Sequence, residues 1–238
     1  MNVMFLIEQV CDFLFRDRKM ESRYATMFLI SERTKVINKI IDELLKYSRE
    51  AIIDANLDRI PVPDISKSFV GPIETKGHFL ATNGSTAYLS TVHRTGNAHM
   101  ISGKTTVTLI LNLGLEKLVV DFDQYEAKYM DIGPRGKMRV TVDQNSIYAV
   151  LSLKYNLVNC TQELVTLIID HLDGIDVRMT GLDPFNWLLD DVVTWVASDF
   201  RGSIKSSIEV GLQQSIKQAL TKYNICKYLP HIHHNSSI

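Results

Sequence analysis

The stretch AHMISGKT at residues 98–105 carries the residue types of a phosphate-binding loop, and LVVD at 118–121 fits the acidic strand that holds magnesium in nucleotide hydrolases. A phosphate loop must join a buried strand to a helix, whose amino-terminal N–H groups hold the phosphates. Here TVTLILNL follows, which alternates at period two, and the chain before Leu118 is too short for a crossover helix. We therefore predict a turn that enters a strand, and no nucleotide site.

Clusters of histidine and carboxylate give no better candidate for chemistry. DHLDGID at 170–176 has His171 between carboxylates, but a polar hairpin end explains it equally well and the spacing is not that of a calcium loop. Neighbouring carboxylates at Asp190 and Asp191 fit a solvated helix edge, and the sequence has no Gly-x-Ser-x-Gly. The His-rich stretch near the C-terminus is typical of a solvated tail (His231, His233 and His234). We predict no catalytic residue, no metal site, no cofactor and no enzymatic activity.

The composition narrows the class of partner. The 238 residues carry 26 basic and 27 acidic side chains, so the formal net charge of -1 offers no electrostatic case for nucleic acid. The hydrophobic content of 45% is ample for a core. No apolar run is long enough to span a membrane, and the apolar start MNVMFLIEQVCDFLF is interrupted by Glu8 and Asp12, so no export signal is readable.

Cysteines and glycosylation sequons leave the compartment open. Three cysteines are too few for a disulfide framework. Cys160 and Cys226 form a bridge if the protein is secreted; otherwise these two and Cys11 are free buried thiols. Three Asn-x-Ser/Thr triplets are candidate glycosylation sites, or chance matches (Asn83, Asn159 and Asn235).

The first element with a clear period is an amphipathic helix at about residues 32–55. Ser31 is expected to cap it, apolar residues recur at helical spacing from Val36 to Ile53, and the prolines of PVPD at 61–64 end it. From Gly77 to Thr180 the period is two, which predicts antiparallel strands with one apolar face. A parity change between Phe122 and Tyr125 predicts a bulge. Turn signals are expected to separate the strands (Asn83-Gly84, Thr95-Gly96-Asn97, Gly133-Pro134, Gln144-Asn145 and Asp173-Gly174).

The pattern of the last segment predicts one very long helix. Asp183 is expected to cap it, Pro184 suits its first turn, and no strong breaker follows until after Tyr223. Apolar residues lie four apart along it (Leu188, Val192, Val196, Phe200, Ile204, Ile208, Leu212, Ile216 and Leu220). Each step of four drifts about 40° around the axis, so the stripe needs apolar cover that winds around the helix. The one-sided, curved antiparallel sheet is the expected cover.

The chain resembles the group 7 mite allergens and related arthropod proteins over about residues 32–224. The resemblance rests on Val62-Pro63-Asp64 after the first helix, on Leu182-Asp183-Pro184-Phe185 and Leu188-Leu189-Asp190-Asp191-Val192 in the last, and on the order of elements between them. It implies an α+β tubular lipid-binding fold of the super-roll type, as in bactericidal/permeability-increasing, lipopolysaccharide-binding, takeout and juvenile-hormone-binding proteins. It also implies an extracellular, non-catalytic protein.

The expected function is therefore to bind a lipid or another small hydrophobic ligand in an apolar tunnel between helix and sheet, with transient contact with lipid surfaces. The alternative is a protein-interaction or surface-recognition module of the same fold with a packed interior. We expect a single domain at 31–224 between an unorganised extension at 1–30 and a tail at 225–238. The expected ligand-binding residues lie on the last helix and, facing it, on the sheet (Trp187, Leu188, Val192, Trp195, Val196 and Phe200; Leu109, Leu111, Leu113, Leu151 and Leu153).

Overall fold

The computed structural model describes residues 23–70, 74–130, 132–156, 159–183 and 185–228, with side chains from Glu32 onward except that of Phe200. Its elements, in chain order, are α2 (Arg23–Asp54), β1 (Ile60–Val62), β2 (Ile65–Val70), β3 (Lys76–Ala87), η2 (Leu89–Thr91), β4 (Val92–Arg94), β5 (His99–Ser102), β6 (Thr106–Leu115), β7 (Leu118–Tyr129), β8 (Arg135–Tyr155), β9 (Cys160–Met179), η3 (Asn186–Leu188), α3 (Leu189–Asp199), η4 (Phe200–Ile204), α4 (Lys205–Lys222) and η5 (Ile225–Lys227).

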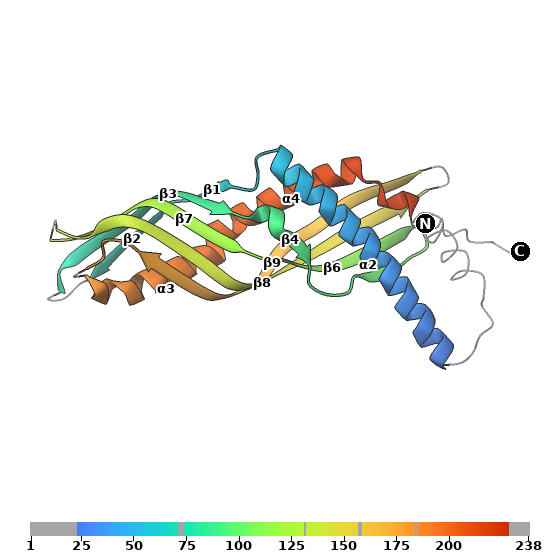
Figure 1. Ribbon diagram of the computed structural model, residues 1–238, viewed down its shortest axis with the longest axis horizontal. Coiled ribbons are helices and arrows are strands. Elements are labelled where there is room, and N and C mark those ends of the chain that lie inside the picture. Colours follow the sequence, from blue (N-terminus) through green and yellow to red (C-terminus); the bar gives the residue numbers. More distant parts are fainter. Residues whose placement is uncertain (1–22, 71–73, 131, 157–158, 184, 229–238) are drawn as a thin grey trace, which may run out of the picture.

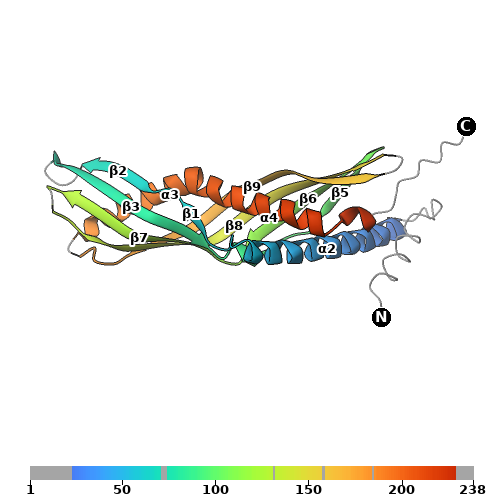
Figure 2. The same ribbon diagram turned by 90° about the horizontal axis from the view of Figure 1, so that it is seen from above.

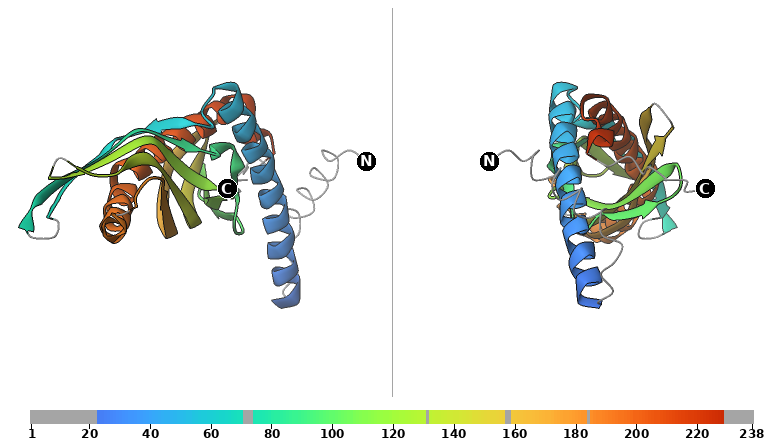
Figure 3. Two further views of the ribbon diagram at one scale, coloured as in Figure 1. Left: turned by 60° about the vertical axis from the view of Figure 1, so that its left-hand side comes forward. Right: turned by 90° about the vertical axis from the view of Figure 1, so that its right-hand side faces the viewer.

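The nine described strands form one antiparallel sheet, elongated along the molecule and strongly curved (Figures 1 and 3). The two longest strands, β8 and β9, pair with each other along both halves of the sheet. In the distal half, where α3 lies, β8 pairs with β7, and β3 and β2 follow outward. In the proximal half, where β6 lies, β8 pairs with β6, and β4 and β5 flank β6. This arrangement confirms the predicted curved, one-sided sheet.

The register of the long strands is irregular at defined places, as is typical of curved sheets. The register between β7 and β8 shifts between Phe122 and Tyr125, which confirms the predicted bulge. Turns lie as predicted at Thr95-Gly96-Asn97, between β4 and β5, and at Gly133-Pro134, between β7 and β8.

Three other predicted turns are wrong, because each lies inside a continuous strand. Asn83-Gly84 lies within β3, where Asn83 has φ 55°. Gln144-Asn145 lies within β8, and Asp173-Gly174 lies within β9 directly across the ladder, where Gly174 has φ 64°. On β8 the buried positions change there from even to odd, with Val142 buried before the change and Ile147 after it. A local change of strand direction uses the same residue types as a hairpin turn, so composition alone did not separate the two.

The C-terminal helix carries the drifting apolar stripe as expected. Every member whose side chain is described is buried: Leu188, Val192, Val196, Ile204, Ile208, Leu212, Ile216 and Leu220. Two details of the prediction are wrong. The helical segment begins at η3, after Asp183, so Asp183 does not cap it. The helix is also interrupted in η4, where Gly202 has non-helical backbone angles (φ -107°, ψ -107°) and separates α3 from α4.

Helix α2 covers the proximal half together with α4 (Figures 1 and 2). It begins at Arg23, so the predicted cap at Ser31 is wrong and that residue lies in mid-helix. Asp42 accepts two hydrogen bonds from Arg94 of β4, both 2.9 Å long, and Asn38 accepts one from the backbone N–H of Ala98. The ring of Tyr47 stacks on Tyr223 with centroids 5.1 Å apart. These contacts fix α2 against both the sheet and the end of α4.

Helix α4 covers the outer edge of β9 in the proximal half. The Glu209 carboxylate accepts a hydrogen bond from the backbone N–H of Ile169 (2.7 Å), and the Gln213 amide donates one to the carbonyl of Leu167 (3.0 Å). An open strand edge presents unpaired backbone groups to other chains, so these side chains protect the edge. At the start of β9, Cys160 and Cys226 form a disulfide, which ties residues just beyond α4 to the sheet.

Candidate ligand-binding site

The residues of AHMISGKT lie on β5 and in the turn to β6, where the Gly103 N–H donates to the Thr106 carbonyl (2.7 Å). Strand β6 follows the turn, which confirms the predicted turn that enters a strand, and LVVD begins strand β7. Within the residues that the structure describes, no group of three or more His, Cys, Asp and Glu side chains is placed to hold a metal ion. The predicted solvated histidines after position 230 lie outside the described residues.

The helices described here do not include one with both the length and the hydropathy needed to cross a bilayer.

Beneath α3, aromatic rings from three strands and two helical turns contact one another. Trp195 of α3 lies 5.5 Å from both Phe69 of β2 and Phe79 of β3, measured between ring centroids. Trp187 of η3 lies 6.1 Å from Phe69 and 5.8 Å from Tyr129 of β7. These are ordinary spacings for interacting rings. We call these residues, with Tyr125 of β7, the distal aromatic group.

Tyr125 contributes a phenolic hydroxyl to the distal aromatic group, and a defined hydrogen bond holds it. Its ring lies 6.1 Å from Phe79, and its Oη donates a 2.7 Å hydrogen bond to the carbonyl of Thr180, just after β9. Burial raises the pKa of this phenol above its ordinary value. The hydroxyl therefore stays neutral and bonded, and the ring packs against Phe79 in the interior.

The predicted leucines lie elsewhere. Leu109, Leu111, Leu113, Leu151 and Leu153 are buried on β6 and on the second half of β8, and these two strands pair with each other. That is the proximal half of the sheet, whereas α3 lies over the distal half (Figures 1 and 2). The expectation that these leucines face the first half of the helix is therefore wrong. The error arose because the two halves of one continuous sheet have the same alternating pattern.

The predicted helix residues do lie along one apolar interior. Leu188, Val192 and Val196 are fully buried, Trp195 is half-buried, and Trp187 is 40% exposed at the distal end. The side chain of Phe200 lies outside the described residues. Leu188, Val192, Val196 and Trp195 join the proximal leucines in a single continuous hydrophobic cluster, whereas Trp187 lies outside it. The rings of the distal aromatic group thus line the interior beneath α3, and leucines of β6 and β8 line it in the proximal half.

Polar contacts hold α3 much less firmly than α4. Among the described residues, the ion pair between Lys67 Nζ of β2 and Asp199 Oδ2, at 3.1 Å, is the polar contact that joins α3 to the sheet. Its side chains are 33% and 24% exposed, so it is only partly screened by solvent. Of the described helices, α3 covers the distal half, whereas α2 and α4 both cover the proximal half (Figure 1).

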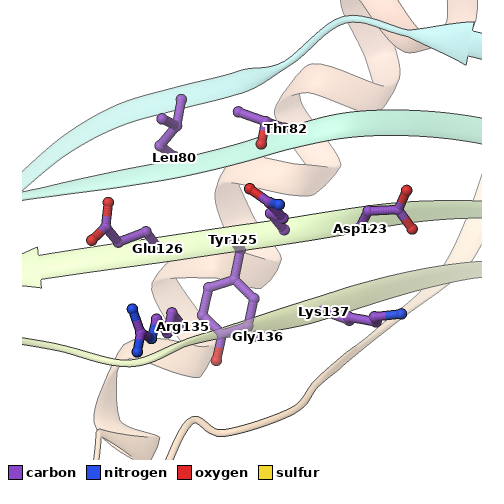
Figure 4. A pocket seen from close by; sticks show the side chains of 9 residues that line it. Leu80, Thr82, Asp123, Tyr125, Glu126, Arg135, Gly136 and Lys137 are labelled. Carbon is purple, nitrogen blue, oxygen red and sulfur yellow. The ribbon is translucent and has the colours of Figure 1, made fainter.

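The outer face of the distal sheet holds an open depression of about 550 Å³ between β3, β7 and β8 (Figure 4). Charged side chains of both signs line it, with Asp123 and Glu126 on β7 and Arg135 and Lys137 on β8. Mixed charges in an open hollow suit solvent, and they do not suit an apolar ligand. The better candidate site is therefore the apolar interior beneath α3.

Phe69, Phe79, Tyr125 and Tyr129 were missed by the sequence analysis. A usable signal was present: Ile65 and Phe69 are the two buried positions of β2, four residues apart, as inward-facing positions of a strand must be an even number apart. Their partners lie on β3 and β7, and only the fold brings these strands together beneath α3.

The comparison with protein families decides the family. The family model described as "Group 7 allergen" matches residues 36–220, well over half of the chain. The chain belongs to the group 7 allergen family. The match begins within α2 and ends within α4, so it includes the whole sheet and α3. A search of curated protein sequences found no match to this chain.

A solved structure shows the fold of this family member. A crystal structure of lipopolysaccharide-binding protein aligns with a TM-score of 0.55 at 15% sequence identity, over 76% of this chain and 38% of that one. The chain thus spans well under half the length of that protein, and the likeness shows a tubular lipid-binding fold. Takeout 1 of Epiphyas postvittana aligns over 82% of this chain and 89% of its own, with 14% identity and a TM-score of 0.35.

Proposed function

We propose that this protein binds a lipid or another small hydrophobic molecule, without catalysis, in a tunnel between the C-terminal helix and the curved sheet. The observation that carries the proposal is the continuous apolar interior, which runs from the distal aromatic group to the proximal leucines. Membership of the group 7 allergen family supports it, as does the fold shared with a protein named for binding lipopolysaccharide.

The mechanism is transfer of apolar surface out of water. Each buried CH₂ of an acyl chain contributes about 0.8 kcal/mol, so a chain of modest length outweighs the cost of association. The aromatic rings beneath α3 offer flat faces that contact an alkyl chain or a fused ring system equally well. The site thus selects for an apolar, elongated ligand.

We also propose that the protein is secreted. The Cys160–Cys226 disulfide supports this, because such bonds persist in oxidising compartments. The candidate glycosylation residues Asn83 and Asn159 are exposed, and Asn235 lies outside the described residues. Glycosylation at these residues stays a prediction, and a mass shift after enzymatic removal of N-glycans would establish it.

The two tryptophans allow a direct test of ligand binding. Trp187→Phe leaves Trp195, in contact with Phe69 and Phe79, as the single tryptophan of the chain. We expect 9,10-dibromostearic acid to quench its fluorescence in a saturable way, because bromine quenches an indole only on close approach. Unbrominated stearic acid is the control and should compete without quenching. Unchanged Trp195 fluorescence with both fatty acids would count against the proposal.

A second candidate function is recognition of an apolar surface by the distal end of the molecule. Four exposed apolar residues lie there (Val70 65%, Met130 64%, Ile132 71% and Trp187 40% exposed). Trp187 contacts the rings of Phe69 and Tyr129, which are the chain neighbours of Val70 and Met130. Ile132 pairs with Tyr129. Trp and aliphatic side chains together are typical of contact with a lipid surface.

Phosphatidylcholine vesicles test this second function. Cosedimentation should fall in Ile132→Ser and stay at the wild-type level in Val165→Ser, which removes another exposed apolar side chain (56%) from the proximal half. Equal cosedimentation of both variants, or none by the wild type, would remove the support for surface recognition.

A further inference from the structure

The segment formed by η3 and α3 (Asn186–Asp199) is bounded by two glycines with unusual backbone geometry. On one side Gly181, just after β9, has φ 70°, a left-handed conformation that favours glycine. On the other side Gly202 interrupts the helix between α3 and α4, and a Cβ added there would meet nothing within 4 Å. Beyond each glycine the chain is anchored: Thr180 accepts the hydrogen bond from Tyr125, and α4 is bonded to β9 through Glu209 and Gln213.

The contacts between this segment and the sheet are of a kind that can be broken and remade. They are the apolar packing of Leu188, Val192 and Val196 in the core, the ring contacts of Trp187 and Trp195 at 5.5–6.1 Å, and the Lys67–Asp199 ion pair. Ring contacts are not directional hydrogen bonds, and an apolar ligand can replace them with contacts of the same kind. The interior beneath the segment is enclosed, so a ligand needs a route through its cover.

We propose that η3 and α3 form a lid, which pivots at Gly181 and Gly202 and is held closed by Lys67–Asp199, and that ligand enters beneath it at the distal aromatic group. The lid's role in ligand entry rests on the proposed function. In the described part of the proximal half, α2 and α4 are both held by hydrogen bonds to the chain segments they cover, so we place the route beneath α3.

Crosslinking across the ion pair tests the lid. The full chain with Lys67→Cys and Asp199→Cys, in a Cys11→Ser background, is joined with a bis-maleimide; the control is the same variant capped with N-ethylmaleimide, which loses the ion pair without a link. Stopped-flow quenching by 9,10-dibromostearic acid should be about tenfold slower, or more, in the crosslinked form, as expected for a gated site. Equal rates in the two forms would overturn the lid.

Hydrogen exchange provides a test that needs no ligand. Amides of α3 should exchange faster than those of α4 in the capped form, and crosslinking should slow α3 alone. Equal exchange of α3 and α4 before crosslinking would overturn the hinge. If α3 exchanges as expected but neither form is quenched, the proposed function is wrong, and so is the lid's role in ligand entry. Equal quenching rates in the two forms would instead overturn the lid alone.

A variant of the ion pair tests the latch separately. Lys67→Gln should increase the rate of quenching about threefold relative to the wild type, because opening no longer breaks a partly buried charge pair. Lys154→Gln is the matched control, since it removes the exposed Lys154–Glu163 pair on the proximal strands. An unchanged rate in Lys67→Gln would show that the ion pair does not hold the lid.

Discussion

The ring of Phe69 lies directly over Gly77, its cross-strand partner on β3, so that a Cβ at residue 77 would be 2.3 Å from the Phe69 ring. The ring has no room to retreat, because Trp187 and Trp195 contact it from the side of the lid. Absence of a side chain at position 77 therefore makes the distal aromatic group possible, as when an aromatic ring covers a strand glycine.

Gly77→Ala should lower the free energy of unfolding by about 1–3 kcal/mol, since the added methyl must displace a packed ring. Gly96→Ala is the control, because its Cβ would meet Asn112 at an ordinary 3.6 Å. Urea denaturation followed by tryptophan fluorescence measures both. A Gly77→Ala protein as stable as the control, with unshifted tryptophan emission, would show that Phe69 does not pack as described.

The drifting stripe can be tested one residue at a time on α4. Leu212 is fully buried, whereas Val210, two residues earlier, is 60% exposed. Leu212→Ala should cost about 2–5 kcal/mol in unfolding free energy, because it removes buried methyl groups and leaves a cavity. Val210→Ala should change it by less than about 0.5 kcal/mol. Similar effects from both, measured by chemical denaturation, would contradict the burial of the stripe.

Gln162 joins the start of β9 to the end of α4 through its side-chain amide. The amide donates to the carbonyls of Leu220 and Tyr223, the latter at 3.0 Å, and accepts from the N–H of Ile225 at 2.8 Å. Gln162→Glu keeps the shape but loses both donated bonds and places a negative charge beside helix C-terminal carbonyls. The expected loss of stability is about 1–3 kcal/mol.

Gln214→Glu, on the exposed face of α4, is the matched control for Gln162→Glu and should be nearly neutral. Thermal unfolding of the two variants side by side provides the comparison. If Gln162→Glu unfolds at the wild-type temperature, the amide is not bonded to the helix end.

Stability should fall at alkaline pH through Tyr223. Burial, followed by the charges of Tyr228 and Glu43, raises the pKa of this phenol well above 10.0, its ordinary value. The unfolded chain therefore loses the proton at a lower pH than the folded protein does. Stability is full below about pH 10 and decreases as the pH rises above it, because the unfolded state binds fewer protons. In Tyr223→Phe the decrease in unfolding free energy between about pH 10 and 12 should be shallower, and an identical slope would contradict the shift.

The order of the elements could be predicted from the sequence because each has its own period. The stripe from Leu188 to Leu220 predicted a helix that needs winding cover, and the parity change between Phe122 and Tyr125 predicted a bulge that the register confirms. Both signals are local, since a single strand or helix contains them.

What the sequence did not predict depends on contacts between distant residues. Gln144-Asn145 and Asp173-Gly174 have turn composition, yet they lie across from each other in one long ladder, and only the pairing of β8 with β9 shows it. The leucines of β6 were predicted to face α3 because nothing in their alternation says which half of the sheet they occupy. For the same reason Phe69 and Phe79 were not recognised as neighbours of Trp195.

The most direct test of the central claim is native mass spectrometry of the protein purified from its own source, followed by organic extraction. A ligand-binding protein should carry an apolar molecule at close to one per chain, and the extract should identify its class. An unliganded mass, together with no uptake of offered fatty acids, would contradict the claim and favour a packed interior with a macromolecular partner.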